Sequence, residues 1–427
     1  MKRKLIAAIG VAAMLGVSAC GSDDGDGGDN GSGGGDKTLT VWVMDGSAPE
    51  EWVTELNKEF EAANEGVTVE IQEQQWNGIQ EKITTSLSED APPDVIELGN
   101  TQTAGYAVTG GLADLTDMKA DLGYDGWNEG MIPSAELDGK LYAAPWYAAN
   151  RAVIYDKSIF EEAGVEPPTT REEWLDGLKK IEEETDAQPI YLPGQSWYVY
   201  SGFLWDEGGD LAVQDGDQWK GSLATPEGEA AMNFYKELAA YSNAPTDIDE
   251  ATPQQSTDIV PKGDVASWIG LGWEAGGAQA AIEEAGGEAD FGYFPIPGKT
   301  ADQPGHVFFG GSNLAVSERS QNKELAQEWL KLATSEKWMK KYAEATGGAL
   351  LPNSEAAQVT PEPGSFAEAM VKSADVGRIT PVTPGWANVE TDPNPIKQYM
   401  TNVLNGSDPQ KAGEDADTTI TERINQG

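Results

Sequence analysis

The stretch TLTVWVMDGSAPEEWVTELNKEFEAAN, from Thr38 to Asn64, decides the fold. Its first seven residues alternate between the two faces of an extended chain, and this pattern predicts a β-strand. After Pro49, the side chains of Trp52, Leu56 and Phe60 fall on one face of a helix. A strand that runs directly into an amphipathic helix indicates the first half of a strand–helix–strand unit.

The same pattern continues along the chain. VTVEIQ (67–72) and DVIEL (94–98) predict two more strands, and IQEKITTSLS (79–88) predicts the helix between them. This order predicts an α/β fold with a parallel sheet and helices on both faces. Ligands of such sheets bind beyond the carboxyl ends of the strands. We therefore expect polar ligand contacts from the loops there, at Asp45, Ser47, Asn100, Thr101 and Gln102.

The sequence that follows these three strands indicates a second α/β region. Amphipathic helices are expected over 169–185, 225–242 and, as a pair, 322–348. The C-terminus predicts two helices separated by a turn at Asn405–Gly406. Five aromatic residues stand in stretches that we interpret as irregular, flanked by glycine or proline, and are therefore candidates for stacking on a ligand: Trp76, Trp146, Tyr198, Trp273 and Trp386.

The composition is strongly acidic and poor in metal ligands. Asp and Glu number 72 against 28 Lys and Arg, for a formal net charge of −44. Such a chain repels phosphate backbones, which argues against nucleic acid as a partner. One cysteine and one histidine allow no internal disulfide, no thiolate zinc site and no histidine-rich metal site. We expect neither a metal nor a cofactor.

The N-terminus predicts export. Three basic residues precede the apolar run Leu5–Val17, which ends in small residues, so 1–19 is predicted to be a signal peptide. Cys20 follows at once and resembles the lipidated cysteine of bacterial lipoproteins; an ordinary signal peptide with an incidental cysteine is the alternative. The segment 20–36 then forms a lipidated cysteine and a flexible Gly/Ser/Asp tether with a reach of roughly 20 Å.

Six stretches in this order resemble the extracellular solute-binding proteins of ABC sugar importers, of the maltodextrin-binding type. They are LTVWVMDG (39–46), APPDVIELGNTQTAGYAVTGGLADLTD (91–117), GKLYAAPWYAANRAVIYDKSIFEEAGVEPPTTREEW (139–174), KGDVASWIGLGWEAG (262–276), FFGGSNLAVSERSQNKELAQEWLKLATSEKW (308–338) and GGALLPNSEA (347–356). MKRKLIAAIG (1–10) and APWYA (144–148) are more similar to the chitobiose-binding lipoproteins of actinobacteria.

The resemblance implies a bilobal type II periplasmic-binding-protein fold with two discontinuous lobes joined by a hinge. Lobe 1 would comprise 37–148 and 299–345, and lobe 2 would comprise 149–298 and 346–427. The ligand would lie in the cleft between them, which closes by hinge motion. By motif position, Tyr198, Trp273 and Trp386 match places where this family stacks sugar rings.

Two further features each have two possible roles. Arg151 either bonds to the ligand or braces a strand. Gly311, Ser312 and Asn313 are expected to form a tight turn, which either brings backbone N–H groups to the ligand or merely leads into the next helices. Maltodextrin binders carry charged residues in the loop after the third strand, where this chain has Asn-Thr-Gln. Neutral groups suit an acetamido sugar or a neutral disaccharide.

We therefore predict an extracytoplasmic, monomeric receptor that binds an oligosaccharide without turnover. A disaccharide such as N,N′-diacetylchitobiose, or a sugar of the cellobiose or xylobiose type, would pass to ABC permease subunits. The only membrane contact would be the lipid anchor. The alternative is a secreted glycoside hydrolase, which needs two facing carboxylates; with 72 acidic residues, composition does not settle this. A surface adhesin is disfavoured because all-β repeats are missing.

Overall fold

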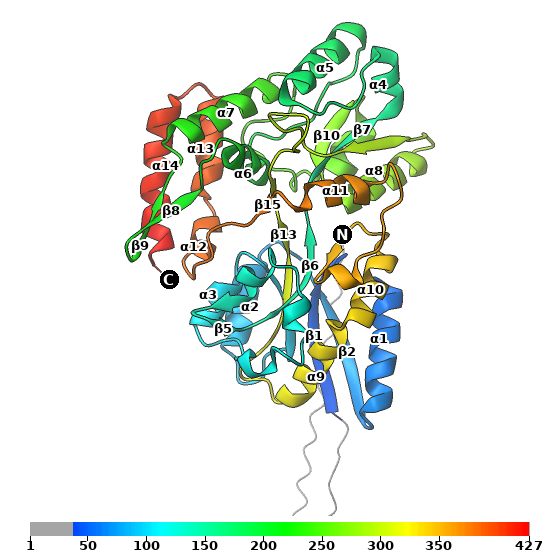
Figure 1. The fold of residues 1–427 in the computed structure, drawn as a ribbon, viewed down its shortest axis with the longest axis vertical. Coiled ribbons are helices and arrows are strands. Elements are labelled where there is room, and N and C mark those ends of the chain that lie inside the picture. Colours follow the sequence, from blue (N-terminus) through cyan, green and yellow to red (C-terminus); the bar gives the residue numbers. More distant parts are fainter. Residues whose placement is uncertain (1–36, 427) are drawn as a thin grey trace, which may run out of the picture.

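The computed structural model describes residues 37–426, so the predicted signal peptide, the tether and Cys20 lie outside the described residues. Two lobes lie one above the other in Figure 1, each with its own sheet. Within 37–426, no helix combines the length and the apolar character needed to cross a membrane.

Lobe 1, the lower body in Figure 1, is built on a six-stranded sheet. The strand order is β14 (Leu351–Pro352), β6 (Ala144–Ala149), β13 (Gly310–Val316), β3 (Val95–Gly99), β1 (Lys37–Met44) and β2 (Val67–Gln74). β1 pairs in parallel with both β2 and β3, whereas β13 runs antiparallel to β3 and β6. The carboxyl ends of β1, β2 and β3 therefore meet at one edge.

Apolar periodicity predicts four of the five α-helices described in lobe 1, but not the short helix α3. The five are α1 (Glu50–Ala63), α2 (Ile79–Leu87), α3 (Thr103–Val108), α9 (Lys323–Ala333) and α10 (Glu336–Ala345). Trp52, Leu56 and Phe60 of α1 are buried in the lobe 1 core, as their spacing predicts. A short hairpin, β4 (Glu136–Leu137) and β5 (Lys140–Leu141), completes the lobe.

Lobe 2 is centred on a smaller antiparallel sheet in the order β10 (Ser267–Gly270), β7 (Ala152–Asp156) and β11 (Phe291–Phe294). Its helices are α4 (Lys157–Ala163), α5 (Arg171–Glu184), α6 (Trp197–Asp206), α7 (Pro226–Ala239), α8 (Gly272–Glu284), α11 (Phe366–Ala374), α12 (Trp386–Glu390), α13 (Pro395–Leu404) and α14 (Pro409–Ile424). A hairpin of β8 (Ala212–Asp215) and β9 (Gln218–Gly221) lies against α14.

Local sequence signals explain where several of these helices begin and end. α5 starts at a capping box in which the Thr170 hydroxyl accepts the Glu173 N–H and the Glu173 carboxylate accepts the Thr170 N–H. The predicted turn between the last two helices is confirmed, with Gly406 at a φ of 95°.

Three connections cross between the lobes. The chain leaves lobe 1 between β6 and β7, returns between β12 (Val307–Phe308) and β13, and crosses again between β14 and α11. Val307 and Phe308 pack in the lobe 2 core, and β12 pairs with β15 (Gly377–Arg378). Leu350 and Ala357 pack in the lobe 1 core. We therefore propose that lobe 1 resumes near 310 rather than 299, and ends near 357 rather than 345.

Candidate functional site

The loops after β1, β2 and β3 come together at the upper edge of lobe 1. Asp45 is exposed, and its carboxylate accepts a hydrogen bond from the Gln75 amide at 3.1 Å. The ring of Trp76, 46% exposed, lies beside the third strand, since a Cβ built on Gly99 would be 3.7 Å from it. Asn100, half-buried, donates to the Phe309 carbonyl at 3.0 Å. This edge therefore offers an exposed aromatic ring beside carboxylate and amide groups.

Ser47 and Ser312 are buried beneath this edge, and their hydroxyl groups bond to the protein interior. The Glu97 carboxylate accepts hydrogen bonds from the Ser47 hydroxyl and the Tyr147 hydroxyl, both at 2.9 Å, and from the Met44 N–H at 2.6 Å. The Ser312 hydroxyl donates to Tyr147 at 3.1 Å. Burial raises the pKa of Glu97, although the hydrogen bonds oppose this. The sequence predicts that Ser47 contacts ligand and leaves the role of Ser312 open. The expectation for Ser47 is corrected, because in this structure both hydroxyls instead satisfy a buried carboxyl and phenol.

The expected turn at Gly311 is also corrected. Gly311, Ser312 and Asn313 belong to β13, which pairs with β3 on one side and β6 on the other. A Cβ at Gly311 would be 2.1 Å from the Tyr147 carbonyl oxygen, so glycine is required for the close approach of β6. Its own carbonyl accepts the Asn100 N–H at 2.9 Å.

Thr101 and Gln102 reach across to lobe 2. Glu390, at the end of α12, accepts a hydrogen bond on Oε2 from the Thr101 hydroxyl at 2.9 Å and a longer one from the Gln102 amide at 3.4 Å. Its Oε1 accepts the Trp386 indole N–H at 2.8 Å. Burial raises the pKa of Glu390, and these three hydrogen bonds act in the opposite direction. A carboxylate of lobe 2 therefore meets the lobe 1 loop directly.

The aromatic candidates of lobe 2 stand in the first turns of helices, not in irregular chain. Tyr198 is the second residue of α6, Trp273 the second residue of α8, and Trp386 the first residue of α12. Tyr198 is half-buried and stacks on Phe308 at 4.4 Å between ring centroids. The guanidinium of Arg151 lies over its ring at 4.8 Å.

Trp273 differs from the others because it is 50% exposed. The neighbouring Glu274 is buried, and its carboxylate accepts the Leu271 N–H at 2.7 Å and the Gln255 amide at 2.9 Å. Burial raises the pKa of Glu274 to about 7. The start of α8, with its open indole ring, is thus fixed by a carboxyl group that titrates near neutral pH.

Trp146 and Trp386 are fully buried, with 0% exposure. Trp146 lies in β6 and packs against Trp52 and Tyr342 in the lobe 1 core, at 5.8 and 5.2 Å. Trp386 packs 6.4 Å from Trp197 in the lobe 2 core. The expectation that they stack on a ligand is therefore corrected for this structure, since neither ring has a free face.

Arg151 is committed to a protein partner. Its guanidinium forms an ion pair of 2.6 Å with Glu250, which also accepts the Ser196 hydroxyl at 3.1 Å. The pair joins the first crossing between the lobes to the start of α6. Arg151 is expected either to bind the ligand or to brace a strand. This ion pair supports the bracing role.

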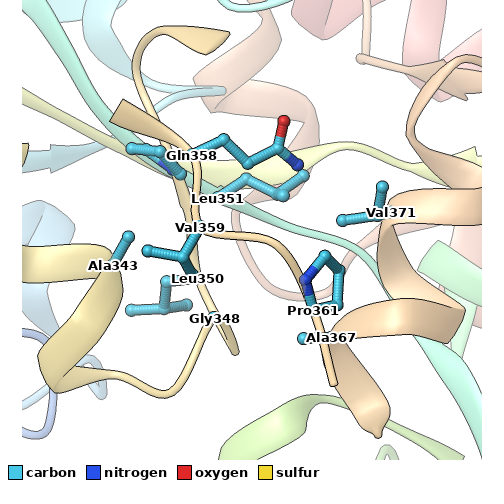
Figure 2. A pocket seen from close by; sticks show the side chains of 10 residues that line it. Ala343, Gly348, Leu350, Leu351, Gln358, Val359, Pro361, Ala367 and Val371 are labelled. Atoms are coloured by element: carbon cyan, nitrogen blue, oxygen red, sulfur yellow. The ribbon is translucent and has the colours of Figure 1, made fainter. Parts of the chain in front are cut away.

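Two cavities differ in whether they are large enough for a sugar. A groove of about 510 Å³ lies between α2 and α3 on one side and α12 on the other, within the range of small-ligand sites. Gln102 is the one expected site residue that lines it. A second cavity, shown in Figure 2, lies between Ala343, Leu351 and Val371 and measures about 10 Å³. It would hold one water molecule at most, so it is no sugar site.

Sequence reasoning missed Glu97, Glu250, Glu274 and Glu390. Each is a carboxylate with at least one partner from another segment of the chain. A chain with 72 acidic residues gives no local signal that would single out these four. Only the meeting of distant segments reveals them.

The fold and this arrangement define a two-lobed binding protein. The GacH receptor of Streptomyces glaucescens matches with a TM-score of 0.77 and 24% identity, over 91% of this chain and 99% of that chain. The sugar-binding protein MalE from Xanthomonas citri matches with a TM-score of 0.75 and 22% identity, over 91% and 98%. These likenesses confirm the predicted bilobal α/β fold.

Residues 45–340 match the family model of the bacterial extracellular solute-binding proteins, and the chain belongs to that family. The diacetylchitobiose binding protein DasA of Streptomyces coelicolor is 50% identical over 100% of both chains. Family membership confirms the prediction of a binding protein rather than an enzyme, and the glycoside hydrolase alternative is set aside.

Proposed function

We propose that this protein captures a disaccharide of the N,N′-diacetylchitobiose type between its lobes and delivers it to the permease of an ABC importer. The observation that carries the proposal is the 50% identity, over the full length, to a diacetylchitobiose binding protein. An acetamido sugar presents apolar ring faces together with amide and hydroxyl groups, so it needs aromatic surfaces and neutral polar partners.

Exposed residues of both lobes are compatible with this ligand class. Trp76 of lobe 1 and Trp273 of lobe 2 are about half exposed and can each present a ring face to a sugar. Asp45 and Asn100 supply polar groups at the strand ends of lobe 1. The sugar would gain full contact from both lobes only after they close on it.

Calorimetry of the purified protein with N,N′-diacetylchitobiose, cellobiose, xylobiose and maltose tests the proposal. We expect tight binding of the acetamido disaccharide and at least tenfold weaker binding of maltose. Recovery of intact sugar after long incubation is also expected. Failure of all four sugars to bind would reject the proposal, and so would preferred binding of maltose.

We further propose that the mature chain begins at a lipidated Cys20 and is held at the outer face of the cell membrane. The basic and apolar N-terminal segments and the position of the cysteine support this. Two acyl chains give stable anchoring, since each buried CH₂ contributes about 0.8 kcal/mol. Replacement of Cys20 by Ser should release the protein from the membrane fraction. Retention of the variant in that fraction would reject the anchor.

A further inference from the structure

Glu390 is the point at which a charged group of lobe 2 touches lobe 1. Its Oε2 faces the loop after β3, where Thr101 donates at 2.9 Å and Gln102 at 3.4 Å. The opposite oxygen is held by the Trp386 indole at 2.8 Å. One carboxylate therefore has one oxygen fixed to its own lobe and the other oxygen turned to the second lobe.

Two basic residues of lobe 2 are paired with other carboxylates. Arg151 pairs with Glu250 at 2.6 Å, and Lys397 pairs with Asp249 at 2.7 Å. Over residues 37–426, the ion pairs do not include Glu390. The hydrogen bonds to Glu390 come from neutral donors, and two of these belong to lobe 1.

Opening of the lobes would remove the two lobe 1 donors and expose the carboxylate to water. The contact made by Gln80, whose amide donates to the Ala387 carbonyl at 3.2 Å, would break at the same time. The Glu390 contact comprises two hydrogen bonds and the Gln80 contact one, so the Glu390 contact is the larger of the two.

We propose that Glu390 is the positioning residue that holds the closed form of the interlobe site, through its hydrogen bonds to Thr101 and Gln102. This inference rests on the proposed function, since it assigns part of the ligand affinity to lobe closure. The Thr101 hydroxyl then serves the closure contact rather than the sugar. Glu390 need not touch the ligand, because it acts on the loop and on α12.

The kinetics of sugar binding distinguish this role from direct ligand contact. If closure follows encounter, loss of the closure contact should raise the dissociation rate and leave the association rate within about threefold. We expect Glu390→Ala and Thr101→Val each to raise the dissociation rate of N,N′-diacetylchitobiose about tenfold. Glu390→Gln, which keeps an acceptor without the charge, should recover part of this loss.

A double-mutant cycle tests the bond itself. Combining Glu390→Ala with Thr101→Val should raise the dissociation rate little beyond either single change, because both remove the same contact. Thr101→Val leaves the Trp386–Glu390 bond intact, so it remains informative where Glu390→Ala lowers stability. Glu288→Gln, at an exposed residue of the same lobe, is the matched charge control. Additive effects of the two changes, or a loss confined to the association rate, would overturn the proposal.

Small-angle scattering without ligand separates this proposal from the proposed function. We expect the radius of gyration of ligand-free Glu390→Ala to exceed that of the wild type, while Glu288→Gln matches the wild type. If no sugar binds the wild type but this expansion is found, the proposed function fails and the closure contact stands. If neither the radius of gyration nor the dissociation rates change, the role of Glu390 in closure is rejected, while the proposed function still stands.

Discussion

The phenol of Tyr147 donates a hydrogen bond to the buried carboxylate of Glu97, at 2.9 Å, and thereby joins β6 to β3 across the intervening strand β13. Ser312, which belongs to β13, donates to the same phenol at 3.1 Å. Three strands of the lobe 1 sheet thus share one polar cluster directly beneath the proposed site.

Tyr147→Phe should lower the free energy of unfolding by about 1–3 kcal/mol, because it leaves a buried acceptor with one partner fewer. Urea denaturation measures the change. Tyr142→Phe, at a partly buried tyrosine outside this cluster, is the control and should stay within about 0.5 kcal/mol of the wild type. Equal losses for the two variants would contradict the assigned role of the cluster.

The stability of lobe 2 should depend on pH through Glu274. Burial raises its pKa from 4.5 to about 7, so the folded state keeps a proton that the unfolded chain releases. The resulting stability is complete below about pH 4.5 and is lost as the pH rises to 7. Its full size is about 3 kcal/mol, from ~1.4 kcal/mol for each pH unit.

Glu274→Gln removes this titration. Unfolding free energies at several pH values from 4.5 to 8 should show the wild type falling relative to the variant, with most of the fall below pH 7. Glu97 and Glu390 titrate in both proteins, so the difference between the two curves isolates Glu274. Parallel curves would show that Glu274 has an ordinary pKa in the folded protein.

Trp273→Ala should weaken sugar binding at least tenfold, because a half-exposed ring at the start of α8 is replaced by a methyl group. Unfolding should change by less than about 1 kcal/mol, since little buried contact is removed. Trp219→Ala, in the hairpin against α14, is the control for loss of a tryptophan outside the site. Unchanged affinity for Trp273→Ala removes this residue from the site.

Trp146→Ala should behave in the opposite way. Its ring is fully buried among Trp52 and Tyr342, so truncation should lower the free energy of unfolding by about 3–5 kcal/mol. Thermal unfolding measures this, and Trp76→Ala, with its exposed ring, should leave the midpoint almost unchanged. A stable Trp146→Ala variant would contradict the observed packing.

The sequence predicts elements well where the pattern is local. The strands and helices of 37–99 follow from alternation and from apolar spacing, and the structure confirms each of them within about two residues. The capping box at Thr170 fixes the start of α5. Such signals depend only on neighbouring residues, so no knowledge of the tertiary fold is needed.

The site is harder to predict, because burial depends on distant segments. The proline before Trp146 predicts irregular chain, yet β6 carries both residues between two other strands. Gly311 was expected in a turn, but its missing side chain serves the approach of Tyr147. Trp273 and Trp386 have the same glycine-flanked context, although one ring is open and the other is enclosed.

The three crossings between the lobes also bear on how the protein survives proteolysis. Each lobe is assembled from chain segments on both sides of a crossing, and the three crossings lie far apart in the sequence. A protease that cuts one of them leaves the lobes joined through the other two. We expect a singly nicked molecule to keep both lobes in one particle, so that backbone integrity and ligand capture can be lost separately.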